Sequence, residues 1–299
     1  MSLMLCAGLL IVIPVLEDRY IYYPVKYPEG EWDVSNPPAR EGQIVPLIED
    51  CYFRTADGLK LHGWYCTPNR KTGREFTPVS AEMVLLWFHG NAGNVTDRYD
   101  MIRALMQVPV RIFIIDYRGY GKSEGSPSER GIYADARAAW DYLSAERKVH
   151  PENVIILGKS LGGAPAIDLA TRVQPAGLIV QSSFTSIADM AGTLIPLFPG
   201  VLLRTKMDSV HKIASVSCPK LFIHSPADEL VPFKMGRRLY EAASEPKRFY
   251  EVPGAPHNST WMVGGKTYLE EVRSFVQSCA ARTGETDVFG ARSLFAGFN

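Results

Sequence analysis

The residue pattern with the clearest chemical meaning is a serine between glycines, in Gly158-Lys-Ser160-Leu-Gly162. An apolar run of strand length leads into it, and a segment compatible with a helix follows. A strand that turns sharply into a helix crowds the backbone, which favours residues without a Cβ atom beside the serine. Such a turn holds the Ser160 hydroxyl clear of the sheet, where a base and a substrate can reach it. The alternative is an ordinary glycine-rich turn, so the partners of Ser160 decide between the two.

A serine hydroxyl needs partners, because at neutral pH it is a weak nucleophile. A base, usually histidine, must take its proton, and a carboxylate must orient that base. In this strand-turn-helix architecture the three residues follow one another along the chain as serine, acid and histidine. Of the six histidines, three lie after Ser160, and these are His211, His224 and His257. Only these three can supply the base in that order.

The acid and the base are expected at the ends of two further strands. Residues 219–224 form an apolar run that leads into a loop containing Asp228. Catalytic groups of open α/β sheets collect at the carboxyl ends of strands. With Asp228 as the acid, His257 is the one histidine left downstream, in a turn-rich loop after another strand-like run. The sequence therefore predicts a catalytic triad of Ser160, Asp228 and His257, with the neighbouring Glu229 as the alternative acid.

Acyl transfer also requires donors for the negative charge that develops on the carbonyl oxygen. One donor is expected to be the backbone N–H of Leu161, directly after the nucleophile. The other is expected after an upstream apolar strand, in the loop His89-Gly-Asn-Ala-Gly-Asn94. We assign it to the N–H of Asn91, with Gly90 and Ala92 as alternatives. The histidine that opens this loop is expected to bond to backbone rather than to react.

Taken together, five segments resemble signatures of the α/β-hydrolase family, in the family's order. They are His89-Gly-Asn-Ala-Gly-Asn94, Asp116-Tyr-Arg-Gly-Tyr-Gly121, Gly158-Lys-Ser-Leu-Gly-Gly163, Asp228-Glu-Leu-Val-Pro232 and Gly254-Ala-Pro-His257, within roughly residues 45–280. More narrowly, the apolar N-terminus and Tyr-Ile-Tyr-Tyr-Pro at residues 20–24 are similar to the membrane-anchored serine hydrolases that include protein depalmitoylases. The resemblance implies an ester or thioester hydrolase and does not name the substrate.

Composition and charge argue against several other classes of function. The 299 residues include 32 basic and 32 acidic ones, so the formal net charge is zero, and no basic run is present. A nucleic-acid-binding surface carries an excess of positive charge, so no nucleic-acid partner is expected. No group of histidines and cysteines has the spacing of metal ligands. Neither a metal nor another cofactor is therefore expected.

The cysteines are few and scattered, at Cys6, Cys51, Cys66, Cys218 and Cys279. They form no CxxC pair, so reduced thiols are expected, as in an intracellular protein. Cys51 and Cys66 flank a predicted hairpin, and a disulfide between them is the less favoured alternative.

The N-terminal residues 3–16 are almost wholly apolar. They are fewer than the roughly 20 residues that cross a bilayer as a helix, and they lack the basic region and cleavage site of a secretory signal. Three interpretations stay open: a membrane anchor that inserts in part, a helix packed on the body or on a second subunit, and the remnant of a longer targeting segment. We expect an intracellular protein, with membrane contact through these residues as one alternative. The oligomeric state stays open.

Strand-like and helix-like segments alternate along the rest of the chain. A hairpin at 44–55 and 59–66 precedes a polar loop at 67–80, strands at 83–88, 111–116, 153–157, 177–181, 219–224 and 247–252, and helices at 95–107, 129–147, 161–173, 233–243 and 265–280. This alternation predicts the α/β class, as a mostly parallel central sheet with an antiparallel N-terminal hairpin and helices on both faces. The expected hydrolase domain is 44–280, after an apolar segment and linker at 1–43 and before a tail at 281–299.

One interval, residues 182–218, replaces the single helix expected there with 37 residues. Because the preceding strand should end beside Ser160, this insertion is expected to form a small cap over the pocket. Its apolar inner face would bind an acyl chain, with Met190, Leu194, Leu197 and Phe198 as the expected lining. The alternative is that these side chains only pack a helix onto the core.

The sequence thus predicts a serine hydrolase for small-molecule or lipid-like carboxylic esters or thioesters, acting through an acyl-enzyme intermediate. An amidase or peptidase would use the same triad. A non-catalytic binding module on this scaffold would normally lack a triad member or a glycine of the turn, and here all are present.

Overall fold

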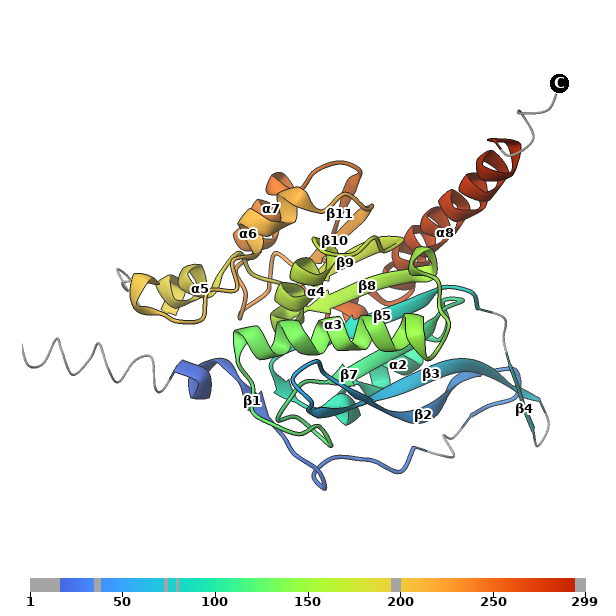
Figure 1. Cartoon of the computed structure of the whole chain (residues 1–299), viewed down its shortest axis with the longest axis horizontal. Coiled ribbons are helices and arrows are strands. Elements are labelled where there is room, and N and C mark those ends of the chain that lie inside the picture. The colour runs from blue at the N-terminus through green and yellow to red at the C-terminus, as the bar shows by residue number, and fades with distance from the viewer. Residues whose placement is uncertain (1–16, 35–38, 73–74, 79–80, 195–199, 294–299) are drawn as a thin grey trace, which may run out of the picture.

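The computed structural model describes residues 17–34, 39–72, 75–78, 81–194 and 200–293. Nine strands within these ranges form one sheet in the order β11-β10-β9-β8-β5-β7-β3-β2, and β4 pairs with β3 (Figure 1). Their bounds are β2 Ile44–Arg54, β3 Lys60–Thr72, β4 Glu75–Pro78, β5 Val84–Phe88, β7 Arg111–Asp116, β8 Val154–Lys159, β9 Gly177–Gln181, β10 Lys220–His224 and β11 Lys247–Glu251.

Six neighbouring strands, β7, β5, β8, β9, β10 and β11, run parallel to one another. In contrast, β3 runs antiparallel to both β7 and β2. Every residue of β5, Val-Leu-Leu-Trp-Phe, is buried, as is every residue of β8. A parallel strand buried on both faces reads as a continuous apolar run rather than an alternating one. The predicted α/β class, with its antiparallel N-terminal hairpin, is confirmed.

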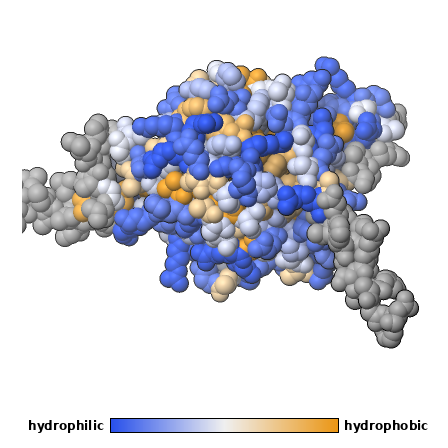
Figure 2. Space-filling model, turned by 90° about the horizontal axis from the view of Figure 1, so that it is seen from above, coloured by the Kyte–Doolittle hydropathy of each residue, from blue (hydrophilic) through white to orange (hydrophobic). Residues whose placement is uncertain are grey.

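Helices cover both faces of the sheet. They are α2 Tyr99–Leu105, α3 Glu129–Ala145, α4 Gly163–Ala170, α5 Ile187–Leu194, α6 Ser209–Lys212, α7 Phe233–Ala242 and α8 Thr260–Ser293. Successive strand residues face opposite sides, so Leu86 packs with α3, α4 and α7 in one core, while Leu85 packs with α2 and α8 in the other. Hydrophilic side chains cover most of the surface seen from above, with hydrophobic areas between them (Figure 2).

Three predicted segments differ from the structure. The polar loop expected at 67–80 is wrong, because β3 continues to Thr72 and pairs with β4. The hairpin register runs on to Ile44 opposite Arg70, and backbone pairing with β2 and β4 holds this polar stretch extended. The helix expected at 95–107 is instead a short 3₁₀ helix, η1 (Val95–Arg98), followed by α2. The last helical stretch, Thr260–Ser293, is broken by the non-helical backbone of Gly265, and the helix expected at 265–280 continues beyond its predicted end to Ser293.

The described cysteines are all reduced. Cys51, Cys66, Cys218 and Cys279 are buried free thiols, so the alternative disulfide between Cys51 and Cys66 is not formed. Cys6 and the apolar residues 3–16 lie outside the described residues. Among the helices that the structure does describe, none combines the length and apolarity that a membrane crossing requires.

Candidate active site

The turn that carries Ser160 joins β8 to α4 through the 3₁₀ helix η3 (Ser160–Gly162). Ser160 has a positive φ of 54°, the strained conformation expected of a sharp turn. A Cβ atom on Gly158 would lie 2.5 Å from the Gly162 carbonyl oxygen, and one on Gly162 would lie 2.0 Å from the Phe88 oxygen. Both glycines are therefore required by the close approach of neighbouring backbone.

Three residues from separate loops form one hydrogen-bond chain. The Ser160 Oγ lies 3.0 Å from Nε2 of His257. The Nδ1 of the same ring lies 2.9 and 2.8 Å from the two oxygens of Asp228. Because a carboxylate only accepts hydrogen bonds, the ring proton belongs on Nδ1, which leaves Nε2 free to accept from the Ser160 hydroxyl. The structure thus brings together the three residues that the sequence singled out.

Asp228 is held as a buried anion by several donors. Its Oδ1 accepts the N–H groups of Leu230 at 3.0 Å and Val231 at 2.8 Å, and its Oδ2 lies 3.3 Å from Nε2 of His224. Burial alone would raise the pKa of Asp228. The hydrogen bonds from His224 and His257 outweigh burial and hold this pKa well below its usual range.

The alternative acid, Glu229, has a different place. Its Oε2 accepts the backbone N–H of His257 at 2.9 Å. It therefore fixes the position of the histidine's backbone, whereas Asp228 faces the ring. Sequence reasoning could not separate two adjacent acids, because which one meets the ring depends on the course of the loop after β10.

The loop expected to supply the second oxyanion donor lies directly over the nucleophile. A Cβ atom on Gly90 would lie 3.6 Å from the Ser160 Cβ. The Asn91 carbonyl accepts the Tyr120 hydroxyl at 2.7 Å and the Tyr23 N–H at 3.3 Å, so this residue is firmly held. Among the hydrogen bonds of the described residues, none uses the N–H of Asn91 or that of Leu161 as donor.

His89, which opens this loop, is fully buried, and its Nδ1 lies 2.6 Å from the Gly90 carbonyl oxygen. Burial lowers the pKa of His89 to about 3, so its ring is neutral at physiological pH. This bond to backbone agrees with the role expected from the sequence.

Comparison with known proteins places this geometry in a family. The chain is 32% identical over 302 residues to the α/β hydrolase domain-containing protein WAV2 of Arabidopsis thaliana, an alignment that covers 94% of each chain. The chain belongs to the α/β-hydrolase family. It is also 35% identical over 280 residues to an uncharacterized protein of Mycobacterium tuberculosis, with 93% of each chain covered. A family model described as serine aminopeptidase, S33, matches residues 80–207.

Solved structures share this α/β-hydrolase fold. The esterase Pf2001 of Pyrococcus furiosus superposes with a TM-score of 0.66 at 18% identity, over 86% of this chain and 98% of that one. An esterase domain from Rhodothermus marinus superposes with a TM-score of 0.56 at 20% identity, over 77% of this chain and all of that one. At these identities the likeness is one of fold.

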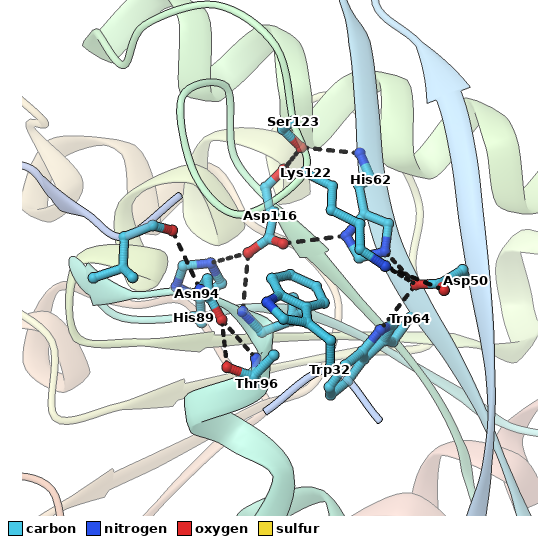
Figure 3. Close-up of polar contacts among 12 residues, drawn as sticks. Trp32, Asp50, His62, Trp64, His89, Asn94, Thr96, Asp116, Lys122 and Ser123 are labelled. Atoms are coloured by element: carbon cyan, nitrogen blue, oxygen red, sulfur yellow. Dashed lines mark hydrogen bonds and ion pairs between the residues drawn. The ribbon is translucent and has the colours of Figure 1, made fainter. Parts of the chain in front are cut away.

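In this α/β-hydrolase a polar network anchors the loop over Ser160 to the sheet. Asp116 accepts the Val95 N–H at 2.9 Å, and its other oxygen lies 3.1 Å from Nδ1 of His62. Figure 3 shows His62 between Asp116 and Asp50. The Nε2 of His62 lies 2.6 Å from Oδ1 of Asp50, and the Lys122 ammonium is also directed at Asp50. The start of η1 is thus tied to the strands rather than left as a free loop.

Ser160 and His257 open onto a cavity of about 850 Å³. Its walls are mostly apolar and come largely from the insertion after β9 and from residues 20–23, with Leu230 and Val231 from the loop after β10. The apolar lining residues include Tyr20, Ile21, Tyr23, Phe184, Ile187, Met190, Ala191, Leu203 and Leu230. Of the predicted lining, Met190 lies on the wall. Leu197, Phe198 and the side chain of Leu194 lie outside what the structure describes.

Residues 17–25 form a wall of the cavity that sequence reasoning missed. Residues 17–21 are helical, and the buried carboxylate of Glu17 accepts the N–H groups of Arg204 at 3.0 Å and Thr205 at 2.8 Å. Farther along, β1 (Tyr23–Pro24) pairs with β6 (Ala92–Gly93), in the loop that lies over Ser160. The sequence offered one signal, an acidic pair directly after an apolar run, but nothing indicated its partners.

Proposed function

We propose that this protein is a serine hydrolase that cleaves carboxylic esters or thioesters with an apolar acyl group. The observation that carries the proposal is the hydrogen-bond chain from Ser160 through His257 to Asp228, opening onto a largely apolar cavity. Each CH₂ group buried by such a wall contributes about 0.8 kcal/mol to binding. A medium-length acyl chain therefore suits this site better than an acetyl group.

In the proposed reaction, Ser160 Oγ attacks the carbonyl carbon and its proton passes to Nε2 of His257. The Asp228 carboxylate stabilises the resulting imidazolium, and the N–H groups of Leu161 and Asn91 hold the oxyanion. The bond to the leaving oxygen or sulfur then breaks, and this atom takes the proton from Nε2. Water, deprotonated by the same histidine, releases the acid from Ser160.

The proposal is tested with a series of 4-nitrophenyl acyl esters and the matched thioesters. We expect kcat/KM to rise with chain length up to medium chains. Ser160→Ala should lower hydrolysis on the order of 10³-fold or more while leaving the unfolding transition unchanged. Hydrolysis at the wild-type rate by Ser160→Ala would remove the basis of the proposal.

An amidase or peptidase is the second candidate, favoured by the description of the matching family model as a serine aminopeptidase. The same hydrogen-bond chain can activate Ser160 against an amide. Aminoacyl 4-nitroanilides, compared with 4-nitrophenyl esters of similar size, separate the two candidates. A kcat/KM for the anilides equal to or above that for the esters would favour the peptidase.

The resemblance to membrane-anchored depalmitoylases extends the proposal to long-chain thioesters, with residues 3–16 in contact with a membrane. Flotation with phosphatidylcholine vesicles tests this extension. The full chain should float with the vesicles, whereas the chain without residues 1–16 should stay in the lower fractions. Equal behaviour of the two chains would contradict a membrane role for this segment.

A further inference from the structure

Two cationic side chains line the cavity beside the nucleophile, in walls that are otherwise mostly apolar. Lys159 directly precedes Ser160, and Arg98 ends η1, which follows the loop over the nucleophile. Lys159 is buried, with an exposed fraction of 5% for the whole residue. A buried cation normally has a counter-ion or a full set of acceptors, because removing it from water is costly.

Neither cation has such a set. The three N–H donors of the Lys159 ammonium have one described acceptor, the Oδ1 of Asn258 at 2.9 Å. Arg98 donates from Nη2 to the Ala92 carbonyl, while its buried Nε has no hydrogen-bond partner. None of the ion pairs among the described residues involves either side chain.

Other buried cations of this protein are fully engaged. The Lys220 ammonium donates to the carbonyl oxygens of Val216 and Cys218, each at 2.7 Å, and lies 3.3 Å from the Ser244 hydroxyl. The Arg118 guanidinium pairs with both Asp135 and Asp57. The Nε atoms of Arg111 and Arg248 also lack a partner, but Lys159 and Arg98 have their unused donors in the lining of the cavity, where a substrate would bind.

The position of Lys159 indicates which part of the substrate it would meet. The Lys159 ammonium donates a hydrogen bond to Asn258, the residue after His257. In the proposed reaction, the Nε2 of His257 gives its proton to the leaving atom. Most of the apolar wall comes from other segments, the insertion after β9 and residues 20–23, and the rest from Leu230 and Val231 after β10. Lys159 is thus bonded to the residue beside His257, and Arg98 to Ala92 in the loop over Ser160. In the proposed reaction this cationic part of the cavity would receive the leaving group, and the apolar wall would receive the acyl chain.

We propose that Lys159 and Arg98 bind an anionic group, a carboxylate or a phosphate, carried by the leaving group of the substrate. The substrates would then be apolar acyl esters or thioesters of an anionic alcohol or thiol. This inference rests on the proposed function, since it assigns a substrate class to the same site. Arginine and lysine are the side chains that proteins use for carboxylates and phosphates.

Protonation supports this assignment. Burial, reinforced by the charge of Arg98 and opposed by that of Asp228, lowers the pKa of Lys159 to about 8. Most of the lysine is therefore still charged at neutral pH. A bound anion would stabilise the charged form further and replace the solvent that burial removed.

The experiment compares two octanoate esters that differ only in charge, 4-(octanoyloxymethyl)benzoate and 4-(octanoyloxymethyl)benzamide. We expect kcat/KM for the benzoate to exceed that for the benzamide by roughly tenfold or more. 4-(Octanoyloxymethyl)phenyl phosphate is the second anionic probe and separates a phosphate preference from a carboxylate one. Lys159→Met and Arg98→Met should each bring the ratio of anionic to neutral rates toward one, and Lys159→Arg should preserve most of it.

The matched control is Lys266→Met, because the Lys266 side chain is 90% exposed on α8. It should leave the ratio at the wild-type value. If both anionic esters and the benzamide are cleaved equally well in a Ser160-dependent reaction, the anion site is wrong and the proposed hydrolase stands. If no ester is cleaved, or Ser160→Ala cleaves them as fast as wild type, the proposed function fails and the inference fails with it.

A measurement on the wild-type protein alone covers the case in which Lys159→Met does not fold. The ratio of anionic to neutral rates should fall as the pH rises through about 8, the pKa of Lys159. The other charged or titratable groups that line the cavity or act on Lys159 are Glu17, Tyr20, Tyr23, His89, Arg98, Asp228 and His257. The neutral ester corrects for their effect on the chemical step. A ratio that stays constant from pH 7 to pH 9.5 would overturn the assignment to Lys159.

Discussion

Glu17 and Thr205 are 188 residues apart in the chain, yet the Glu17 carboxylate accepts both the backbone N–H of Thr205 and its hydroxyl, at 2.8 and 2.9 Å. This contact joins the segment before the hydrolase domain to the insertion after β9. Both segments line the cavity, so the contact closes one side of the cavity beside Ser160. The first residues of the described chain are therefore part of the site rather than a simple linker.

Glu17→Ala should lower the free energy of unfolding by about 2–4 kcal/mol, because it leaves the buried N–H and hydroxyl of Thr205 and the part-buried N–H of Arg204 without an acceptor. It should also raise KM for 4-nitrophenyl octanoate, since one wall of the cavity loses the hydrogen bonds that hold it in place. Asp18→Ala is the matched control, because its pair with Arg204 is partly exposed and should contribute less than about 1 kcal/mol. Urea unfolding and steady-state kinetics measure both effects. Equal losses in the two variants would contradict this role of Glu17.

Asp228→Asn should reduce kcat on the order of 10⁴-fold, because an amide next to Nδ1 favours the wrong tautomer of His257. Glu229→Gln should cost less than about tenfold, since a glutamine oxygen can still accept the His257 N–H. Both are measured with 4-nitrophenyl octanoate. A severe loss for Glu229→Gln together with a mild one for Asp228→Asn would move the acid by one residue.

The depressed pKa of Asp228 has a consequence for acid stability. In the unfolded chain this carboxyl takes up a proton as the pH falls below about 4, near the usual aspartate pKa of 3.8, whereas in the folded protein it stays ionised. Its stabilising contribution is therefore complete above that pH and is lost as the pH falls toward the lower folded pKa. The free energy of unfolding should decrease more steeply between pH 5 and pH 3 in wild type than in Asp228→Asn. If the free energy of unfolding, measured with urea, changes with pH in the same way in both proteins, the lowered pKa of Asp228 is contradicted.

Met190 on α5 should influence the preferred acyl-chain length. Met190→Trp fills part of the cavity, so kcat/KM should fall for 4-nitrophenyl decanoate much more than for the acetate. Thr193→Trp places the same side chain at an exposed position of the same helix. This control should leave the chain-length profile unchanged. A profile unaffected by Met190→Trp would mean that the acyl chain lies elsewhere.

The sequence predicted the parts of the site that local patterns specify. Ser160, Asp228 and His257 each follow an apolar run, and a buried parallel strand is recognisable because packing on both faces excludes polar residues. The carboxyl ends of such strands meet at one edge of the sheet, so their order in the chain was enough to select these residues.

The rest depends on segments that meet only in three dimensions. Nothing local to Glu17 indicates Thr205 as its partner, and nothing local to Lys159 indicates that its ammonium turns toward Asn258. The same reason explains the missed strand pair at β3 and β4. Polar sequence there resembles a loop, and pairing with neighbouring strands decides its conformation.

The most direct test of the central claim is the location of covalent modification by a fluorophosphonate, read by mass spectrometry of the digested protein. We expect one adduct, on Ser160 in the peptide that contains Gly158-Lys-Ser-Leu-Gly162, and much slower labelling in His257→Ala because the serine loses its base. No labelling of Ser160 in the folded wild-type protein, or equally rapid labelling in His257→Ala, would contradict it.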